Sequence, residues 1–444
     1  MDELLLARAQ MGMLFAFHIV FAVAGMGMPL LMVIAEAAHL RTGKPVFLEL
    51  ARRWARGTAV LFAVGAVSGT VLSFELGLLW PGFMAFSGGI VGLPFALEGF
   101  AFFAEAIFLG IYLYGWGRVR PAAHLLSGIA VALGGAMSGI LVVAANAWMN
   151  SPAGFVAMDG KPTAIDPLAA MANPAWPTEA AHMTLAAFAA SGFAVAGIHA
   201  YKLLRDRENL FHRHALSIAL AVGGAAALLL PVSGDFNARF IARDQPAKLA
   251  ALEGQFRTER GAPLRIGGIP DIEKGTTRFA IEIPKGLSLL AFHDADAEVA
   301  GLEAFPPEDR PDPLPVHLAF QLMVACGTAL AAVSLLSAWR AAARRGGLFE
   351  SGFLRAVVCC SPLGIVAVEA GWAVTEMGRQ PWVIRGVMRT ADAVTPVGGL
   401  IFPFAFFSAL YMALGVSAIW LLRREVSQSP SFPLEERAAG APKE

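Results

Sequence analysis

A glutamate at the end of a long apolar stretch is the residue of this chain whose surroundings most clearly indicate chemistry. Glu376 closes that stretch, and the sequence Gly-Arg-Gln-Pro-Trp follows at 378–382. An ionisable group at membrane depth is costly, so it usually has a function. From chemistry alone, Glu376 is either a proton carrier or the counter-ion of Arg379.

Further ionisable residues lie inside other apolar stretches. His18 is in the middle of the first one, where a packed, hydrogen-bonded histidine and a metal or haem ligand are equally consistent with the sequence. Glu98 and Glu105 are seven residues apart, about two helical turns, so both carboxylates lie along one helix face. Such a pair indicates a proton relay or a metal site. The alternative is a pair that snorkels to opposite interfaces.

His182 and Met323 lie early in two later apolar stretches. A neutral imidazole and a thioether are a known axial pair for low-spin haem, although a lone methionine in an apolar helix is usually core packing. Glu75 lies near the end of its stretch and is interpreted as a solvated interface residue. Arg385 and Arg389 follow Trp382, and their guanidinium groups would suit haem propionates.

Two charged residues stand out in a long polar segment at 235–314. Lys248 and Glu253 are five residues apart there. Charges on a short amphipathic turn are usually just solvated. A quinol, however, needs one polar group to accept its protons and another to hold its ring oxygen, so both interpretations stay open at this point.

The elements that must position these side chains are transmembrane helices. Of 444 residues, 57% are hydrophobic and 15% are charged, and the mean hydropathy is +0.60, which indicates a polytopic membrane protein. We predict an all-α bundle of about nine transmembrane helices. Stretches that are long enough to cross a bilayer fall near 12–36, 57–80, 94–116, 124–149, 179–201, 214–234, 315–338, 353–376 and 397–422.

Basic residues concentrate in every second connection between these stretches, as the positive-inside rule requires. This predicts an N-terminus outside and a C-terminus in the cytoplasm. The first apolar stretch lacks the basic start and cleavage site of a secretory signal and is expected to be retained. The predicted parts are helices 1–6 in 1–234, an extracytoplasmic loop at 235–314, helices 7–9 in 315–424 and a disordered tail at 425–444.

The charge balance argues against a nucleic-acid partner, since 34 basic residues face 34 acidic ones without a long basic run. No C-x-x-C-H sequence is present for covalent haem attachment. Two small-residue patterns allow close helix approach in lipid and are candidate contacts with a partner. These patterns are Gly65-x-x-x-Gly69 and Gly135-x-x-x-Gly139.

Taken together, these residues resemble a known family, subunit I of the cytochrome bd quinol oxidases. The resemblance covers essentially the whole chain before the tail, with the motifs in the family's order. Its most specific part is Trp372-x-x-x-Glu376-x-Gly-Arg379-Gln380-Pro-Trp. The other members of the set are His18, Glu98, Glu105, His182, Lys248, Glu253 and Met323.

The resemblance implies three haems. His182 and Met323 would hold a low-spin haem b, Glu376 would be the axial ligand of a high-spin haem b, and His18 would serve the haem d that binds oxygen. Trp372, Arg379 and Gln380 would belong to the cofactor-binding residues through their motif. Asn146 resembles, more weakly, a polar residue that flanks the high-spin pair.

The acidic and loop residues also match family positions. Glu98 and Glu105 resemble the pair in which one carboxylate faces haem d and the other supplies protons. The segment 235–314 resembles the quinol-binding loop, with Lys248 and Glu253 at its quinol-interacting positions. The family has subunit II as partner in a heterodimer, with a small single-helix accessory subunit, in the lipid of the bacterial inner membrane.

The activity implied is oxidation of quinol at the outer face and reduction of oxygen to water, which generates a proton gradient without pumping. Two features depart from the family pattern. Gln321 stands where many members carry arginine, and the loop is short, as in a branch where a further haem b could replace haem d. The alternatives are a proton-coupled transporter, which would be colourless, and a haem b electron carrier without oxygen reduction.

Overall fold

The protein is a bundle of long helices in the computed structural model, which describes residues 3–343, 347–427 and 430. Among these residues, nine helical spans are long and apolar enough to cross a membrane, which confirms the predicted fold class. The spans are α1 (Glu3–Thr42), α2 (Pro45–Leu79), α3 (Pro81–Tyr114), α4 (Pro121–Asn150), α6 (Trp176–Leu203), α7 (Leu210–Asp244), α10 (Pro313–Ala342), α11 (Ser351–Cys360) with α12 (Leu363–Met377), and α14 (Ile401–Ser427).

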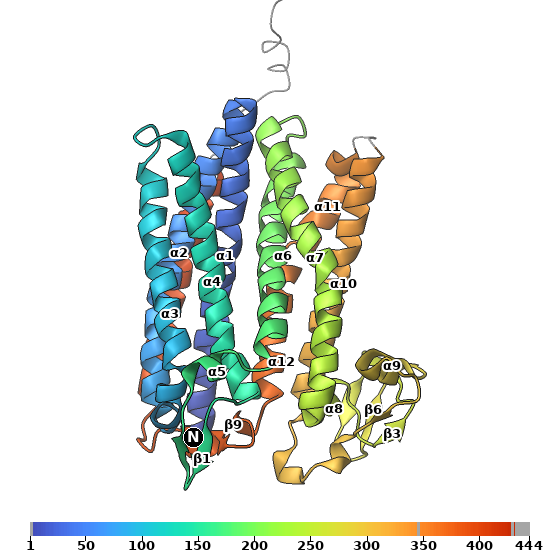
Figure 1. The fold of residues 1–444 in the computed structure, drawn as a ribbon. Coiled ribbons are helices and arrows are strands. Elements are labelled where there is room, and N and C mark those ends of the chain that lie inside the picture. Colours follow the sequence, from blue (N-terminus) through green and yellow to red (C-terminus); the bar gives the residue numbers. More distant parts are fainter. Residues whose placement is uncertain (1–2, 344–346, 428–429, 431–444) are drawn as a thin grey trace, which may run out of the picture.

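The long helices stand side by side, and the N-terminus lies at the same end of the bundle as the strands and the short helices α5, α8 and α9 (Figure 1). Helix α1 packs against α2, α4 and α6, while α3 pairs with α4, α6 with α7, and α10 with α12. Helices are the expected solution because lipid offers no partner for an open backbone polar group. Helix α1 also contacts α7, α12 and α14, so it touches more of the long helices than α3 or α10 does.

Three non-membrane segments connect the long helices at that end. The first carries β1 (Val156–Met158), β2 (Lys161–Thr163) and α5 (Pro167–Met171), and the last carries β9 (Trp382–Ile384), β10 (Met388–Arg389) and α13 (Thr390–Ala393). The middle one contains α8 (Pro246–Leu252), β3 (Glu259–Arg260), β4 (Leu264–Ile266), β5 (Ile269–Asp271), β6 (Thr276–Arg278), β7 (Ile281–Ile283), α9 (Gly286–Phe292) and β8 (Glu298–Val299). Its strands pair antiparallel as β3 with β8, β4 with β7 and β5 with β6.

Three short 3₁₀ helices complete the described chain: η1 (Leu302–Ala304), η2 (Pro307–Asp309) and η3 (Gly347–Phe349). Helix α7 continues to Asp244, so the beginning of the segment predicted as a loop at 235–314 is helical. Pro246 follows and opens α8 as its first residue, a position that proline favours. Most of the tail predicted to be disordered at 425–444 lies outside the described residues.

The small-residue patterns are used within the chain. A Cβ at Gly65 would lie 3.5 Å from the Cβ of Phe21, and one at Gly139 would lie 2.5 Å from the Sδ of Met26. Both of these neighbours are on α1. The small residues let α2 and α4 approach α1, and the interpretation of these faces as contacts with a partner is wrong.

Candidate functional site

The carboxylate of Glu376 is the centre of a polar cluster at the end of α12. Asn146 of α4 donates from Nδ2 to Oε1 at 2.5 Å, and Arg379 donates from Nη2 to Oε2 at 2.6 Å. The Arg379 side chain is only 2% exposed. Its Nε donates to the carbonyl of Trp382 at 3.3 Å, while its buried Nη1 has no partner in the described chain.

Two more motif residues lie around this carboxylate. Gln380 donates to the carbonyl oxygen of Glu376 at 3.5 Å and accepts from the hydroxyl of Thr390 at 2.8 Å, which ties the turn to α13. Trp372, one helical turn before Glu376, packs on Phe15 of α1 with ring centroids 5.5 Å apart. Its Nε1 is a buried donor without a partner among the described residues.

A chain of hydrogen bonds links this cluster to α8. Lys248 donates from Nζ to Oδ1 of Asn150 at 3.1 Å, and Asn150 donates to the carbonyl of Asn146 at 3.1 Å. Lys248 is only 4% exposed, so its burial lowers the pKa of its amine to about 8, an effect that the nearby carboxylate of Glu179 opposes. The structure therefore brings Lys248 and Glu376 into one network.

Glu253 lies at the other end of α8 and is also buried, at 2% exposure. Burial raises the pKa of its carboxyl to about 8, against the opposing effect of Arg265. Its Oε2 has no hydrogen-bond partner within the described part of the chain. The interpretation of Lys248 and Glu253 as solvated charges is thus wrong, although the two residues face different surroundings.

Glu179 is a member of the cluster that the sequence analysis did not single out. It lies in the first turn of α6, three residues before His182, and acts electrostatically on Lys248. A glutamate at the start of a span is ordinary at an interface, so composition gave no reason to select it. Its spacing of three from His182, which puts both on one helix face, was the available signal.

His18 and His182 make the same type of contact on different helices. The Nδ1 of His18 lies 2.9 Å from the Oγ of Ser68 on α2, and the Nδ1 of His182 lies 2.8 Å from the Oγ of Ser233 on α7. No hydrogen bond to the Nε2 of His18 or His182 occurs in residues 3–343 or 347–427. Both rings therefore keep one nitrogen for a ligand.

Met323 of α10 points toward α12. Its Sδ lies 3.0 Å from the position that a Cβ at Gly371 would take, so the thioether occupies the space left by that glycine. Helix α12 packs against both α10 and α6, the helix of His182. The two predicted axial residues are thus carried by helices that flank the same third helix.

Glu98 and Glu105 both contact α4, which agrees with the prediction that they share one helix face. Ser138 donates to Oε1 of Glu98 at 2.8 Å. Glu105 is 4% exposed, and its Oε1 lies 3.3 Å from the position of a Cβ at Gly135 and has no hydrogen-bond partner in the described chain. The alternative of two carboxylates that snorkel to opposite interfaces does not fit this arrangement.

Two predictions about individual residues need correction. Glu75 is fully buried and accepts a hydrogen bond from Nε2 of Gln10 at 2.6 Å, so its interpretation as a solvated interface residue is wrong. Arg385 and Arg389 are paired with Asp244 at 2.9 Å and with Asp309 at 2.6 Å. Arg379, with its unpaired Nη1, is the better donor for a propionate.

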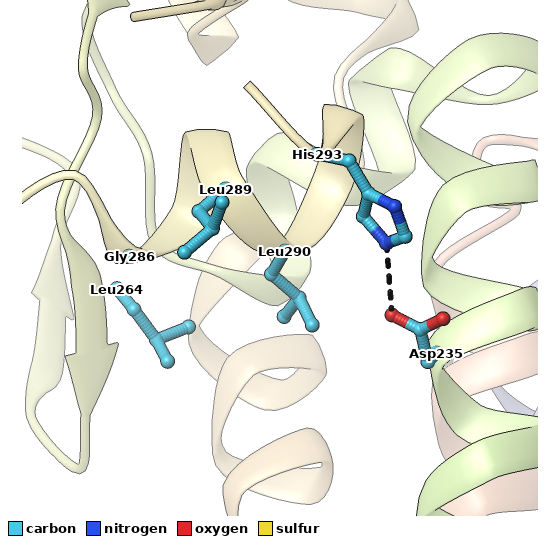
Figure 2. Close-up of a pocket in the computed structure, with 6 residues that line it drawn as sticks. All are labelled: Asp235, Leu264, Gly286, Leu289, Leu290 and His293. Carbon is cyan, nitrogen blue, oxygen red and sulfur yellow. Dashed lines mark ion pairs between the residues drawn. The ribbon is translucent and has the colours of Figure 1, made fainter. Parts of the chain in front are cut away.

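A pocket of about 450 Å³ lies between the end of α7 and α9 (Figure 2). Leu264, Leu289 and Leu290 line it, and Nε2 of His293 lies 3.7 Å from Oδ1 of Asp235 at its side. Leu264 also packs against the cluster of buried side chains that includes Leu249 of α8. Leu264 thus connects the pocket with the apolar cluster that contains Leu249, while Lys248 and Glu253 do not line the pocket.

These donor atoms fit haem better than a bare metal ion. Among the described residues, no three His, Cys, Asp or Glu side chains gather as a metal ion would require. Haem iron needs only one or two protein ligands, such as histidine, methionine or another side chain. The unpaired donors Arg379 Nη1 and Trp372 Nε1 would suit the carboxylates of a porphyrin.

Comparisons with known proteins agree with this chemistry. The family model described as cytochrome bd terminal oxidase subunit I matches residues 6–430. A Bacillus subtilis (strain 168) protein, provisionally named cytochrome bd menaquinol oxidase subunit I, is 39% identical over 95% of this chain and 96% of its own length. Cytochrome bd ubiquinol oxidase subunit 1 of the same organism is 32% identical over 96% and 94%.

A solved structure is similar throughout. The bd oxidase from Geobacillus thermodenitrificans has a chain that matches with a TM-score of 0.91 and 38% sequence identity. The match covers 97% of this chain and 99% of that one. The bundle and its connecting segments thus follow one common arrangement.

Proposed function

The chain belongs to the cytochrome bd terminal oxidase subunit I family, and we propose on this premise how its residues share the reaction. Membership makes the protein an oxidoreductase of the bacterial inner membrane, with haem cofactors, quinol as substrate and a subunit II partner. Quinol is oxidised at the end of the bundle that carries α8 and α9, and oxygen is reduced to water. When bound, the haems carry the electrons and activate oxygen.

The protein's own residues hold these groups. His182 and Met323 hold a low-spin haem b, Glu376 a high-spin haem b, and His18 a haem d or a further haem b. The observation that carries this assignment is the cluster at Glu376. Two donors, Asn146 and Arg379, orient a single carboxylate in the membrane, and Arg379 keeps one buried donor for a propionate.

The quinol approaches through the pocket between α7 and α9. Its leucines offer the apolar surface that a quinol ring and tail need, as small-molecule sites usually do. Glu253 takes a proton from the quinol, and Lys248 holds its ring oxygen as a donor. The packing of Leu264 against the cluster that contains Leu249 of α8 supports this proposal.

Protons leave and enter on opposite sides. The basic connections between helices predict that the N-terminal end of the bundle faces outward, and α8 and α9 lie at that end (Figure 1). Protons from quinol are then released outside. Protons for water come from inside through Glu105 and Glu98, which creates a membrane potential without a pump. In this proposal a small single-helix accessory subunit joins the heterodimer of this chain and subunit II.

The first test is the variant Glu376→Gln, which keeps the shape of the side chain but removes its charge. Oxygen uptake should fall by roughly 100-fold or more, because loss of a partner that only orients a metal ligand already costs about 10- to 100-fold, while the spectrum of the His182/Met323 haem persists. The exposed loop variant Glu273→Gln should leave both unchanged. Oxygen uptake at the wild-type rate in Glu376→Gln would overturn the assignment.

A reduced-minus-oxidised spectrum of membranes with both subunits tests the cofactors themselves. A red-shifted chlorin band that responds to carbon monoxide identifies haem d, and b-type bands with that response identify a further haem b in its place. Low-spin bands alone, with no carbon monoxide response, would support an electron carrier without oxygen reduction. The absence of any haem band would support the transporter alternative.

A further inference from the structure

His18 and His182, which each keep Nε2 free of a hydrogen bond within the described residues, share one supporting arrangement. Each ring places Nδ1 against a serine hydroxyl of the neighbouring helix: Ser68 for His18 and Ser233 for His182, at 2.9 and 2.8 Å. Each serine is followed by a glycine. A Cβ at Gly69 would lie 2.9 Å from Cε1 of His18, so the glycine leaves room for the ring.

The serine hydroxyl decides which ring nitrogen carries the hydrogen. Ser68 donates from Oγ to the carbonyl of Gly65 at 3.1 Å, and Ser233 donates to the carbonyl of Leu230 at 3.0 Å. A hydroxyl has one hydrogen, and a carbonyl oxygen only accepts. Each serine oxygen must therefore accept a hydrogen bond from the histidine, so Nδ1 is the donor. In the neutral ring, Nε2 then carries no hydrogen and keeps its lone pair.

The four fully buried histidines of the described chain do not have this arrangement. Both ring nitrogens of His124 are used, by Glu36 at 2.7 Å and by the carbonyl of Tyr112 at 2.9 Å. His317 is bonded on both sides to backbone carbonyls. His199 and His212 bond to each other through Nδ1 at 2.8 Å.

We propose that Ser68 and Ser233 are positioning residues that hold His18 and His182 in the Nδ1–H form, with Nε2 presented to haem iron. This inference rests on the proposed function. A hydrogen bond from the far nitrogen fixes the ring's orientation and raises the basicity of the ligating one. A neutral serine that already donates to its own helix is a weaker acceptor than a carboxylate, so the rings stay neutral imidazoles.

The test compares Ser68→Ala and Ser233→Ala in the complex with its partner, with each haem followed separately by redox titration and low-temperature spectra. Loss of the acceptor makes the imidazole a weaker donor to iron, which stabilises the oxidised state less. The midpoint potential of the affected haem should rise, and retention of that haem should fall roughly 10-fold or more. Ser233→Ala should change only the low-spin haem, and Ser68→Ala only the haem served by His18.

Two controls separate positioning from packing. Ser334→Ala on α10 removes a buried serine with the same type of bond to its own helix, at 2.7 Å to the carbonyl of Leu330, and should leave all potentials unchanged. Ser233→Thr and Ser68→Thr restore a hydroxyl and should restore the wild-type potential. Unchanged potentials and spectra in both alanine variants, or equal shifts in Ser334→Ala, would overturn the proposal. A wild-type protein without haem bands would instead reject the proposed function.

Discussion

At the scale of single residues, the two ionisable side chains of α8 are buried where sequence alone suggested solvated charges. Lys248 is 4% exposed and Glu253 is 2% exposed. Burial disfavours the charged form, which raises the pKa of the Glu253 carboxyl to about 8 and lowers the pKa of the Lys248 amine to about 8. Both groups therefore change protonation in the same range, where a proton acceptor works best.

This predicts a bell-shaped pH profile for kcat/KM with a soluble quinol, with its maximum near pH 8. The rising side reflects ionisation of Glu253, and the falling side reflects loss of the proton from Lys248. Glu253→Gln should flatten the rising side, and Lys248→Met the falling side, in initial-rate measurements. The variant Glu298→Gln, at an exposed position of strand β8, is the control. A profile that keeps both sides in both variants would contradict the roles of these residues.

The same carboxyl group makes stability depend on pH. The pKa of Glu253 is raised from 4.5 to about 8, so the folded protein holds this proton more tightly than the unfolded chain. Its contribution to the free energy of unfolding is fully present below pH 4.5 and is lost as the pH rises toward 8. Thermal unfolding should show a smaller loss of stability over this range in Glu253→Gln than in the wild type.

At the scale of helices, hydropathy predicted the spans well and their ends poorly. Helix α7 continues to Asp244. In this polar last part of the helix, Asp235 and Arg239 form an i,i+4 ion pair at 2.6 Å, which stabilises the helix beyond its apolar stretch. The hydropathy of the sequence cannot reveal this continuation, because the residues there are polar. The spacing of Glu98 and Glu105, by contrast, predicted that they share one helix face, because helical periodicity is local; that face contacts α4.

The close contact between Gly371 of α12 and Met323 of α10 leads to a further prediction. A valine at Gly371 would place its Cβ 3.0 Å from the Sδ of Met323, so Gly371→Val should displace the thioether. Loss of methionine ligation should lower the potential of the low-spin haem, because a His/Met pair raises it. Redox titration is the measurement. Gly327→Ala, on the same helix as Met323 and with open space around it, should have no effect, and an unchanged potential in Gly371→Val would contradict the contact.

At the scale of the whole molecule, the members of the candidate site come from distant parts of the sequence. Asn146, Lys248 and Glu376 meet in one hydrogen-bonded network although they lie on α4, α8 and α12. Residue types and order could identify Lys248 and Glu376 as candidates. The sequence could not reveal that they lie together, or that Glu179 joins them, because these contacts depend on how the helices pack.

The orientation of the whole bundle is the basis for placing quinol oxidation outside, and it can be tested directly. Asp296, on the segment between α7 and α10, and Glu208, between α6 and α7, are both exposed. They lie on connections that the positive-inside rule places on opposite sides. In a variant without native cysteines, Asp296→Cys should react with a membrane-impermeant maleimide in intact spheroplasts, whereas Glu208→Cys should react only after permeabilisation. The reverse labelling pattern would show that the bundle has the opposite orientation, with the α8 segment in the cytoplasm. It would contradict proton release outside, whereas the haem assignments are tested separately by their spectra.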